Sequence, residues 1–459
     1  MPKKYHIRPK PTPNRFVPPG KYVIVEQDQY CLHCPTNACI KKDCPYDVYT
    51  ERRFDSAQLR DIIDNLCKGC FRCIQGCKNN AISRTINPEY LVLGDEYWTP
   101  EIVISTYNQA ETGKIPVSGA GYGGPFTGPG FDSMWTDMSE IVRPTRDGIH
   151  GREYIATNID LGKKLPYLEF NEEGGLISEP STILELPIPI IFNPIPFGVL
   201  SKEVILAQAK AAKILGIFMI IKENDLSPEI LQYKDNLIPL IDEVVEDKIK
   251  DFVMVEFVDH DGVLALLEKA KAINPKVVTL IRLEFNQETV HRVLELTKGG
   301  AEVIHLCADE QGKELTASNP RFIKEMIREV HLSLVEQSLR DRVTLIVSGG
   351  IAEASHLAKA IICGVDGVAI DLPLLVALEC RLCRNCEQGL PCPVKIETID
   401  AEWATKRMVN LMNAWHSQLI EVMGAMGIRE ARRLRGEVGR AMNFTDLEEE
   451  SFRCVKKEM

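Results

Sequence analysis

Cysteine is the residue type in this chain with the most chemistry to offer. The sequence has 459 residues and 15 cysteines, and all of them except Cys307, Cys363 and Cys454 fall in three tight groups. An odd total argues against a closed set of disulfides, and Cys-x-x-Cys spacing without an apolar signal segment is typical of metal binding. The three remaining cysteines are expected to be plain thiols, with Cys307 and Cys363 buried, because free cysteine packs like a small apolar side chain.

The first two groups have the spacing of a module that holds two iron–sulfur clusters. The groups are Cys31, Cys34, Cys39, Cys44 and Cys67, Cys70, Cys73, Cys77. The second matches the bacterial ferredoxin run, and the first is the same run with longer gaps. In such modules the fourth cysteine of each run ligates the other cluster. We therefore predict one [4Fe–4S] cluster on Cys31, Cys34, Cys39 and Cys77, and another on Cys67, Cys70, Cys73 and Cys44.

Two alternatives remain for this module. Zinc accepts pairs of Cys-x2-Cys, but zinc does not require the run Cys-x2-Cys-x2-Cys-x3-Cys, so soft thiolates in this order favour iron–sulfur clusters. Two clusters in one small module usually pass single electrons, and a purely structural role is the other reading.

The third group follows the last predicted strand of the chain directly. It consists of Cys380, Cys383, Cys386 and Cys392. Three of these thiolates would hold a [3Fe–4S] cluster and all four a [4Fe–4S] cluster, while a zinc site is the rival. If the preceding strands close into a barrel, this group lies at the carboxyl rim, where the active sites of such barrels are found.

Short apolar runs alternate with amphipathic stretches between residues 181 and 379. The runs are Ile188–Phe192, Ile217–Ile221, Leu237–Ile241, Phe252–Phe257, Val277–Ile281, Val303–Leu306, Val343–Val347 and Val368–Ile370. Buried strands separated by helices indicate parallel βα units, and Ser201 is the expected N-cap of the first helix. We predict an α/β fold with a (β/α)8 TIM barrel, and a doubly wound open sheet is the alternative.

Composition divides the chain into five parts. These are a polar arm (1–20), a ferredoxin-like α+β module (21–90), an irregular connector (91–180), the barrel (181–379) and an iron–sulfur loop with C-terminal helices (380–459). The basic residues in 429–440 are expected to form a solvated helix face or a domain contact.

The overall balance of residues narrows the class of protein. Hydrophobic residues make up 45%, charged residues 26%, and the net charge is −11. This is ordinary globular composition and a poor match to a nucleic-acid binder. The longest apolar run is broken by prolines, and the basic start lacks a signal-peptide core, so we expect a cytoplasmic protein without a membrane span.

Glycines after the seventh predicted strand and before the eighth point to a phosphate. Ser348, Gly349 and Gly350 follow strand seven, and Gly367 lies in the approach to strand eight. Barrels commonly bind phosphate in these two loops, and glycine lets the anion approach the backbone. An ordinary strand-to-helix turn is the alternative. Asp371 ends strand eight, where a carboxylate would repel a phosphate.

Two further sequence patterns also have plainer explanations. Gly119, Gly121 and Gly124 fit G-x-G-x-x-G formally, but prolines follow and no helix opens, so we expect no NAD(P)H site in this chain. The segment with Arg143, Arg146, His150 and Arg152 is either a loop that faces an anion or a solvated loop paired with its own acidic residues.

Together these residues resemble a known family. The arrangement is similar to the FMN-binding domain of glutamate synthase, in the archaeal-type, stand-alone form that carries its own ferredoxin module. The resemblance covers about residues 95–445 and rests on the segments Ile190–Glu203, Ser348–Ile351, Gly364–Asp371, Ala377–Val394 and Val422–Leu434.

The resemblance implies a set of cofactors and a reaction. FMN would lie against Ser348, Gly349, Gly350 and Gly367, with Arg282 as the basic residue of strand five. Reduced FMN would reduce 2-iminoglutarate, which forms from 2-oxoglutarate and ammonia. The family's C-x5-C-x4-C-P motif holds a [3Fe–4S] cluster beside FMN. Here Cys380, Cys386 and Cys392 give that motif with one extra residue, and Cys383 could complete a [4Fe–4S] site. No catalytic residue is assigned.

The chain also departs from the family. Segments 221–227, 256–262 and 308–314 stand in place of its Gly-rich, Lys-Pro-Gly and Gly-Gly-Thr-Gly loops, and the chain starts Met-Pro without the cysteine nucleophile of a glutaminase. We therefore expect a redox partner subunit or a ferredoxin as electron donor, a separate glutaminase subunit, and membership of a larger complex. The alternative is a non-catalytic electron-transfer subunit with a degenerate flavin site.

Overall fold

The computed structural model of the chain describes residues 5–31, 34, 44–50, 62–115, 128–136, 155–165, 167–178, 181–198, 200–447 and 449–450. The predictions for some residues lie outside these ranges, and these residues are Cys39, Gly119, Gly121, Gly124, Arg143, Arg146, His150, Arg152 and Cys454.

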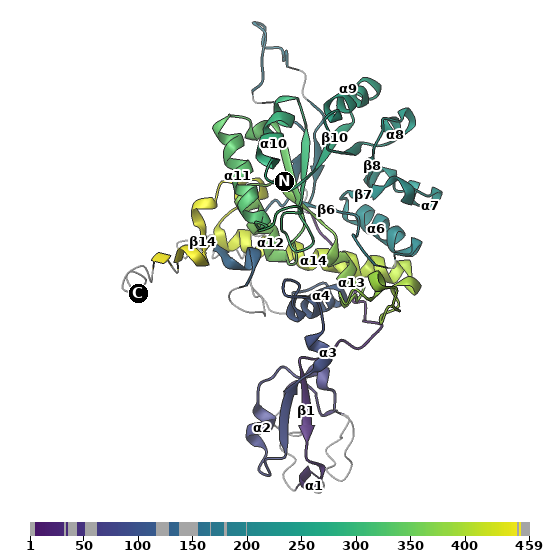
Figure 1. Cartoon of the computed structure of the whole chain (residues 1–459), viewed down its shortest axis with the longest axis vertical. Helices are drawn as coiled ribbons and strands as arrows, with labels where there is room; N and C mark the ends of the chain where they lie inside the picture. Colours follow the sequence, from purple (N-terminus) through teal and green to yellow (C-terminus); the bar gives the residue numbers. More distant parts are fainter. Residues whose placement is uncertain are drawn as a thin grey trace.

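The body of the molecule is a closed barrel of parallel strands (Figure 1). The strands are β6 (Ile190–Phe192), β7 (Met219–Lys222), β8 (Leu237–Ile241), β9 (Met254–Val258), β10 (Val278–Glu284), β11 (Val303–Cys307), β12 (Thr344–Ser348) and β13 (Gly367–Ile370). β13 pairs with β6 and closes the ring. The predicted TIM barrel is confirmed, and the open-sheet alternative is wrong. All eight predicted runs form its strands.

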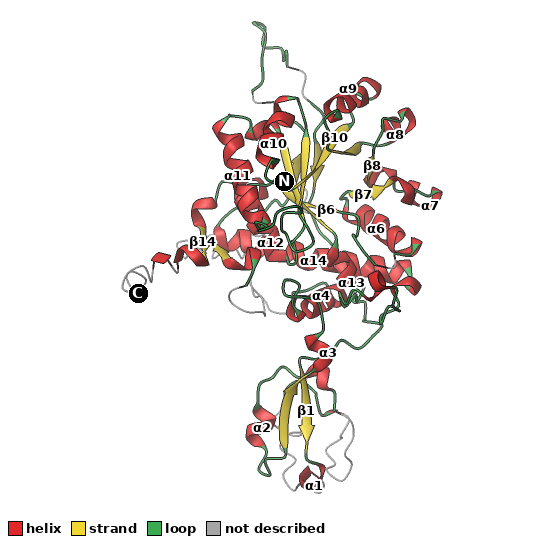
Figure 2. Cartoon of the chain, in the orientation of Figure 1, coloured by secondary structure: helices red, strands yellow, loops and turns green. Residues whose placement is uncertain are grey.

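Helices surround the barrel and connect its strands (Figure 2). They are α6 (Lys202–Leu215), α7 (Pro228–Leu231), α8 (Glu246–Asp251), α9 (Val263–Ile273), α10 (Thr289–Lys298), α11 (Ile323–Glu336), α12 (Ala354–Cys363) and α13 (Leu372–Ala377). Ser201 occupies the N-cap position of α6, but its side chain makes no cap hydrogen bond and its hydroxyl oxygen is buried without a partner. The predicted N-cap position of Ser201 is therefore confirmed.

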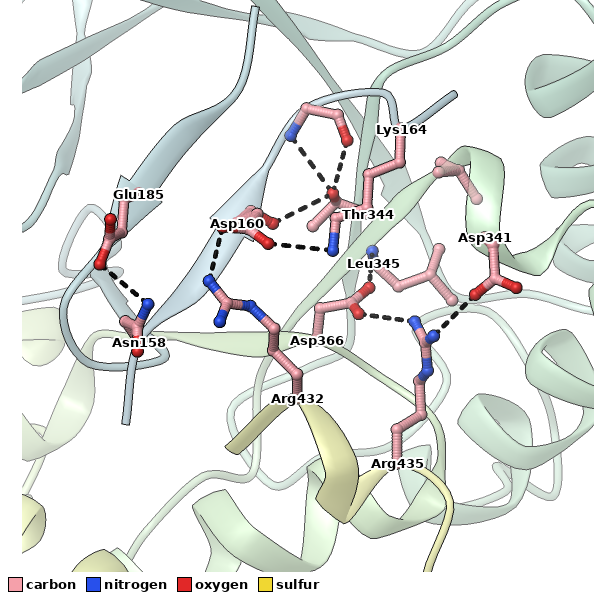
Figure 3. A network of polar contacts seen from close by, with 12 residues as sticks. Asn158, Asp160, Lys164, Glu185, Asp341, Thr344, Leu345, Asp366, Arg432 and Arg435 are labelled. Atoms are coloured by element: carbon pink, nitrogen blue, oxygen red, sulfur yellow. Dashed lines mark hydrogen bonds and ion pairs between the residues drawn. The ribbon is translucent and has the colours of Figure 1, made fainter. Parts of the chain in front are cut away.

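The amino end of the barrel is closed by segments from both sides of the sequence (Figure 3). A hairpin of β4 (Ile159–Leu161) and β5 (Leu184–Leu186) lies there, and Thr344 at the start of β12 donates to the Gly162 carbonyl at 2.9 Å. Arg432 binds Asp160 at 2.7 Å, and Arg435 binds Asp366 at 2.8 Å. The basic 429–440 segment therefore makes a domain contact.

Segments before and after the barrel pack together on its outside. α4 (Pro100–Thr112) and the long α14 (Ala401–Met426) lie side by side, and α14 also packs on α6. The predicted irregular connector thus contains a helix of 13 residues. α15 (Ala431–Leu434) follows, and β14 (Ala441–Asn443) pairs with β3 (Met134–Thr136) in antiparallel orientation.

The N-terminal arm is bound to this outer layer along its length. Tyr5 donates its hydroxyl to the Leu215 carbonyl at 2.7 Å, and the backbone of Lys10 bonds to the side chain of Asn410. Arg407 of α14 is fully buried and donates to three carbonyls, those of Thr12 in the arm, Tyr107 in α4 and Ala377 in α13. One buried cation therefore joins three separate segments.

The small N-terminal module hangs below the barrel in Figure 1. It contains the antiparallel pair β1 (Tyr22–Glu26) and β2 (Ile82–Ile86), with α1 (Asp28–Cys31) and α2 (Arg72–Gly76), and α3 (Pro88–Leu91) leads to the barrel. Its apolar centre consists of Ile24, Val48, Tyr49 and Ile82, with cysteines packed around it. Among the described residues, no helix combines the length and apolar character that crossing a bilayer requires.

Replacing Arg407 tests the packing of arm, α4 and α13. Arg407→Leu leaves three buried carbonyls without a donor, so it should cost about 3–5 kcal/mol of stability and lower the Tm by several degrees. Arg433→Ala is the control, because that side chain is 74% exposed and should change little. Equal melting of the two variants, measured by calorimetry on cluster-loaded protein, would contradict this role.

Candidate functional site

One pocket of the small module gathers four predicted cluster ligands. Cys44, Cys67, Cys70 and Cys73 line it, together with apolar residues such as Val48 and Ile74. Burial raises the pKa of the Cys73 thiol, and neighbouring Cys67 and Cys44 add to this effect. Thiolates this close to one another need a cation between them. The grouping is the one predicted for the second cluster, with Cys44 contributed by the first cysteine run.

The described ligands of the other predicted cluster are Cys31, Cys34 and Cys77. Cys31 ends α1, and the Cys34 amide donates to the Cys31 carbonyl at 3.1 Å. The Ala81 amide donates to the sulfur of Cys77 at 3.3 Å, which is the type of backbone contact that tunes cluster potentials. Cys39, the fourth predicted ligand, lies outside the described residues.

The third group of cysteines lines a single pocket in the loop between α13 and α14. Cys380, Cys383, Cys386 and Cys392 all border it, next to Phe197 and Gly198 of the loop after β6. Burial and, to a smaller extent, the three other thiols raise the pKa of the Cys380 thiol to about 12. All four sulfurs are therefore available to one metal cluster.

The backbone of this loop has an unusual conformation. Glu379, Leu382 and Arg384 have φ angles of 72°, 54° and 55°, a region that residues other than glycine rarely adopt. The Leu382 amide donates to the Cys380 sulfur at 3.4 Å. Strained residues of this kind collect at functional sites, where they turn amide groups toward a ligand.

An ion pair from the N-terminal arm holds the two ends of the loop. The Glu379 carboxylate, 3% exposed, accepts from the backbone and side chain of Arg15 at 2.6 and 3.1 Å. The same guanidinium donates to the carbonyls of Val394 and Lys395, beyond the last cysteine. Arg15 thus connects residues on both sides of the cysteine pocket.

The small module is attached beside this loop. The Gly94 amide donates to the Arg381 carbonyl at 3.0 Å, and Glu89 of α3 lies 3.7 Å from the Arg381 guanidinium. Tyr107 of α4 donates to the carbonyls of Glu379 and Cys380. The predicted entry point of electrons is therefore joined to the third cysteine group by direct contacts.

A chain of polar side chains crosses the carboxyl mouth of the barrel. Asn193, after β6, donates to Asp371 at 3.0 Å and accepts from Arg282 at 2.7 Å. Arg282 also binds Glu256 of β9 at 3.1 Å, and Glu256 lies 2.6 Å from Nδ1 of His305 on β11. Glu256 and His305 are fully buried.

In this row of polar side chains, neighbours of opposite charge shift the pKa of each titratable group. Burial disfavours a charged His305, but Cys307 and Glu256 outweigh it and raise the imidazole pKa to about 9. Burial likewise opposes ionisation of Glu256, yet Arg282 and His305 lower the pKa of its carboxyl. Two atoms, Nε of Arg282 and Nε2 of His305, are buried without a hydrogen-bond partner in the described part of the chain. Such atoms can receive a ligand.

Sequence reasoning found Arg282 but missed Glu256, His305 and Asn193. The sequence did contain a sign of this pair, because an acidic residue and a histidine each interrupt an otherwise apolar strand. These strands are Met254–Val258 and Val303–Cys307. A polar residue buried in a strand of this kind needs a partner, and the partner of each is the other.

The predicted phosphate residues do not all lie at the mouth. Ser348 ends β12, and Gly349 and Gly350 follow it with φ angles of 93° and 66°. A side chain on Gly349 would meet the Asp309 carbonyl at 2.4 Å, so these glycines allow the 308–312 loop to pack closely. Gly367 begins β13 at the amino end of the barrel, against Ile159 of β4. The prediction for Gly367 is therefore wrong.

The mouth fits the ring of a flavin better than its phosphate. The unpartnered donor of Arg282 suits a ring carbonyl. Asp371, however, caps α13 by accepting from the Leu372 amide at 2.6 Å, and Glu353 is the N-cap residue of α12. Glu353 is buried and Asp371 is half-buried, and desolvation raises the pKa of each carboxyl, for Glu353 well above its usual value with a further contribution from Asp132. An ionised carboxylate at either helix start would repel a phosphate.

Asp132, Glu353 and His356 lie close enough together to hold a metal ion. The Ala352 amide donates to Nδ1 of His356, which leaves the ring proton on Nε2, and Nε2 lies 3.0 Å from Asp132. A metal at Nε2 would need the other tautomer, so this arrangement favours a structural hydrogen bond.

Comparison with known proteins finds one family model, described as the conserved region in glutamate synthase, which matches residues 253–429. The chain is 25% identical to an archaeal-type glutamate synthase [NADPH] of Dehalococcoides mccartyi, over 91% of this chain and 94% of that protein. It is 26% identical to the protein of that name in Thermotoga maritima, over 95% and 97%. An archaeal glutamate synthase [NADPH] of Methanocaldococcus jannaschii is 26% identical, over 94% and 98%.

Solved structures with a similar fold are more distant in sequence. A mandelate oxidase variant with a monooxide FMN adduct is 13% identical, with a TM-score of 0.45 over 76% of this chain and 92% of that one. A flavocytochrome b2 variant with bound pyruvate is 13% identical, with a TM-score of 0.43 over 79% and 84%.

Cys383 tests how many sulfurs the third pocket uses. Since four thiolates hold a [4Fe–4S] cluster, Cys383→Ser should convert it to a three-iron form and remove about one iron per chain. Iron analysis and EPR of the oxidised protein measure this. Cys363→Ser, a buried thiol elsewhere, should keep the full iron content. An unchanged EPR spectrum in Cys383→Ser would show that this sulfur is not a ligand.

Arg15 tests the role of the N-terminal arm in the same loop. Arg15→Ala leaves the buried Glu379 carboxylate unpaired, at a cost of about 3 kcal/mol, and frees both ends of the loop. We expect an iron chelator to remove the third cluster at least tenfold faster than from the unmodified protein. Arg8→Ala, a change earlier in the arm, is the control. Equal rates in the two variants would contradict the clamp.

Proposed function

The chain belongs to the glutamate synthase family, and from this premise we propose that it is an iron–sulfur and flavin oxidoreductase that makes glutamate from 2-oxoglutarate and ammonia. The observation that carries the proposal is the third cysteine pocket at the barrel's carboxyl rim, to which the small module is directly attached. The relatives over most of the chain's length are named glutamate synthase, which supports an oxidoreductase acting on a CH–NH2 group.

The clusters are proposed to carry electrons one at a time toward the mouth. Two [4Fe–4S] clusters in the small module receive them from a redox partner subunit or a ferredoxin. The third pocket holds a further cluster, and four converging cysteines favour the [4Fe–4S] type. Arg381, which contacts both the module and the loop, keeps the two sites together.

FMN, when bound in the mouth, would pair these electrons and supply a hydride. Arg282 is placed to donate to the ring, because Asn193 and Glu256 fix its guanidinium from two sides. Glu256 keeps this cation and His305 in a buried, water-poor setting, where charges act strongly. Ser348, Gly349 and Gly350 form the turn that we propose to face the FMN phosphate.

A second candidate is an electron-transfer subunit that has lost its flavin. Asp371 and Glu353 favour it, because each places a carboxyl at a helix start where a phosphate would otherwise bind. The barrel would then serve to dock the clusters within a larger complex.

One preparation distinguishes the two. Protein purified without oxygen is analysed for iron, sulfide and flavin, and then supplied with a chemical reductant, 2-oxoglutarate and ammonium. Flavin together with ammonia-dependent glutamate supports the first candidate. Iron and sulfide without flavin, even after incubation with FMN, supports the second. Full flavin loading without glutamate formation would reject the proposed substrate.

Asp371 offers a direct test of the phosphate end. Asp371→Gly removes a carboxylate that would repel the phosphate, so it should strengthen FMN binding about tenfold or more. A tenfold change in affinity corresponds to about 1.4 kcal/mol. Asp371→Asn keeps an oxygen that can accept from Leu372, so it should give the same gain if charge is the cause. Fluorescence titration with FMN measures both. No gain in either variant would show that Asp371 does not oppose the phosphate.

A further inference from the structure

Cys307 lies in a setting that none of the cluster or flavin assignments explains. It is the last residue of β11, at the carboxyl end of the barrel, and it is 8% exposed. His305 stands two positions earlier on the same strand, so both side chains face the same way. Since His305 meets Glu256 from β9 across the interior, that shared direction is into the barrel mouth.

The three side chains have the order of an activated nucleophile. Glu256 accepts from Nδ1 of His305 at 2.6 Å, which orients the ring and leaves Nε2 as the second ring nitrogen. Nε2 is buried and makes no hydrogen bond of good geometry among the described residues. The Cys307 thiol interacts with this imidazole, and each of the two groups shifts the pKa of the other. A thiol, an imidazole and a carboxylate in sequence form the arrangement that produces a thiolate–imidazolium pair.

The charge balance of the mouth supports this pair. Arg282 and His305 bring two positive charges, and Glu256 brings one negative charge. The Asp371 carboxyl accepts from the Leu372 amide and from Asn193, so its hydrogen-bond partners there are neutral groups. Burial also opposes ionisation of Cys307, but His305 and Arg282 outweigh it and lower the pKa of the thiol. The two neighbouring cations therefore favour a thiolate at Cys307. The thiol also lies 3.7 Å from the His305 carbonyl, which is a weak acceptor for it.

Arg282 adds a recognition element beside the sulfur. Its side chain is 19% exposed, so it reaches the open mouth, and its Nε has no partner in the described residues. Guanidinium groups match carboxylates in shape and charge, and they carry five N–H groups, enough for more than one acceptor.

We propose that Cys307, His305 and Glu256 form a nucleophilic thiolate site in the barrel mouth, and that Arg282 directs to it small carboxylates that carry an electrophilic carbon. With a carbonyl carbon, the step forms a bond from sulfur to carbon, and the π electrons of the carbonyl move to its oxygen. That oxygen takes the proton from Nε2 of His305, so a neutral adduct forms without oxidation or reduction. The site needs neither flavin nor clusters, and thus goes beyond the proposed function.

The test compares two alkylating probes on the intact, cluster-loaded protein. Iodoacetate carries a carboxylate next to its electrophilic carbon, and iodoacetamide is the neutral counterpart. We expect iodoacetate to label Cys307 at least tenfold faster than iodoacetamide, as followed by peptide mass spectrometry. The net charge of the chain, −11, opposes this preference, so only a local cation can produce it.

Cys363 provides an internal control in the same sample. It is 5% exposed, similar to Cys307, and burial raises the pKa of its thiol to about 12. Cys363 should stay unlabelled while Cys307 reacts. Labelling of Cys307 no faster than Cys363, or faster labelling by iodoacetamide, would overturn the proposal.

Variants and pH separate the roles of the neighbours. Arg282→Gln should abolish the preference for iodoacetate and keep reaction with iodoacetamide. His305→Asn should slow both probes at least tenfold. If these variants fold poorly, the unmodified protein decides: labelling of Cys307 should reach half of its maximal rate at a lower pH than that of an ordinary thiol, whose pKa is about 8.5. A rate that rises through pH 8.5 as for a free thiol would reject the thiolate. Glutamate formation is not a readout, so failure of the proposed function leaves this result separate.

Discussion

Four thiolates cannot share one buried pocket unless a cation lies between them. Burial and neighbouring thiols raise the pKa of Cys73 in one cysteine pocket and of Cys380 in the other. The surrounding protein must therefore hold the loop in place before metal arrives and keep it there afterwards. The left-handed residues around Cys380, the Arg15 clamp and the contacts of Tyr107 all serve this requirement. Several contacts of the outer layer of the barrel therefore hold this loop in place.

The charged side chains at the mouth of the barrel also need partners of opposite charge. Asp371, Asn193, Arg282, Glu256 and His305 form one continuous chain that no single member could form alone. Removing any charged member would leave another buried charge without its partner, which is costly in a low-dielectric interior. The chain thus fixes the position of every side chain that a ligand in the mouth would meet.

Some of this could be predicted from sequence because it depends on local pattern. Strands of a parallel barrel are covered on both faces, so they read as short continuous apolar runs, and all eight were found. The spacing of the cysteines also indicates metal-cluster ligands without any knowledge of the fold. The same continuous burial hides which residues face inward, so the pairing of Glu256 with His305 was missed. Gly367 precedes strand eight as expected, but the loops that bind phosphate in barrels follow the strands, so its assignment to the phosphate was wrong. The packing of the N-terminal arm depends on partners about 400 residues away, such as Asn410, and no local pattern reports them.

That distance has a consequence for how the molecule matures. The arm is translated well before the carbonyls and side chains that bind it, which lie between Glu379 and Asn410. The cysteines of the small module all precede residue 78, so they are also translated before those partners. The loop at Cys380–Cys392 therefore gains its contact with Arg15 only after more than 350 further residues have followed the arm.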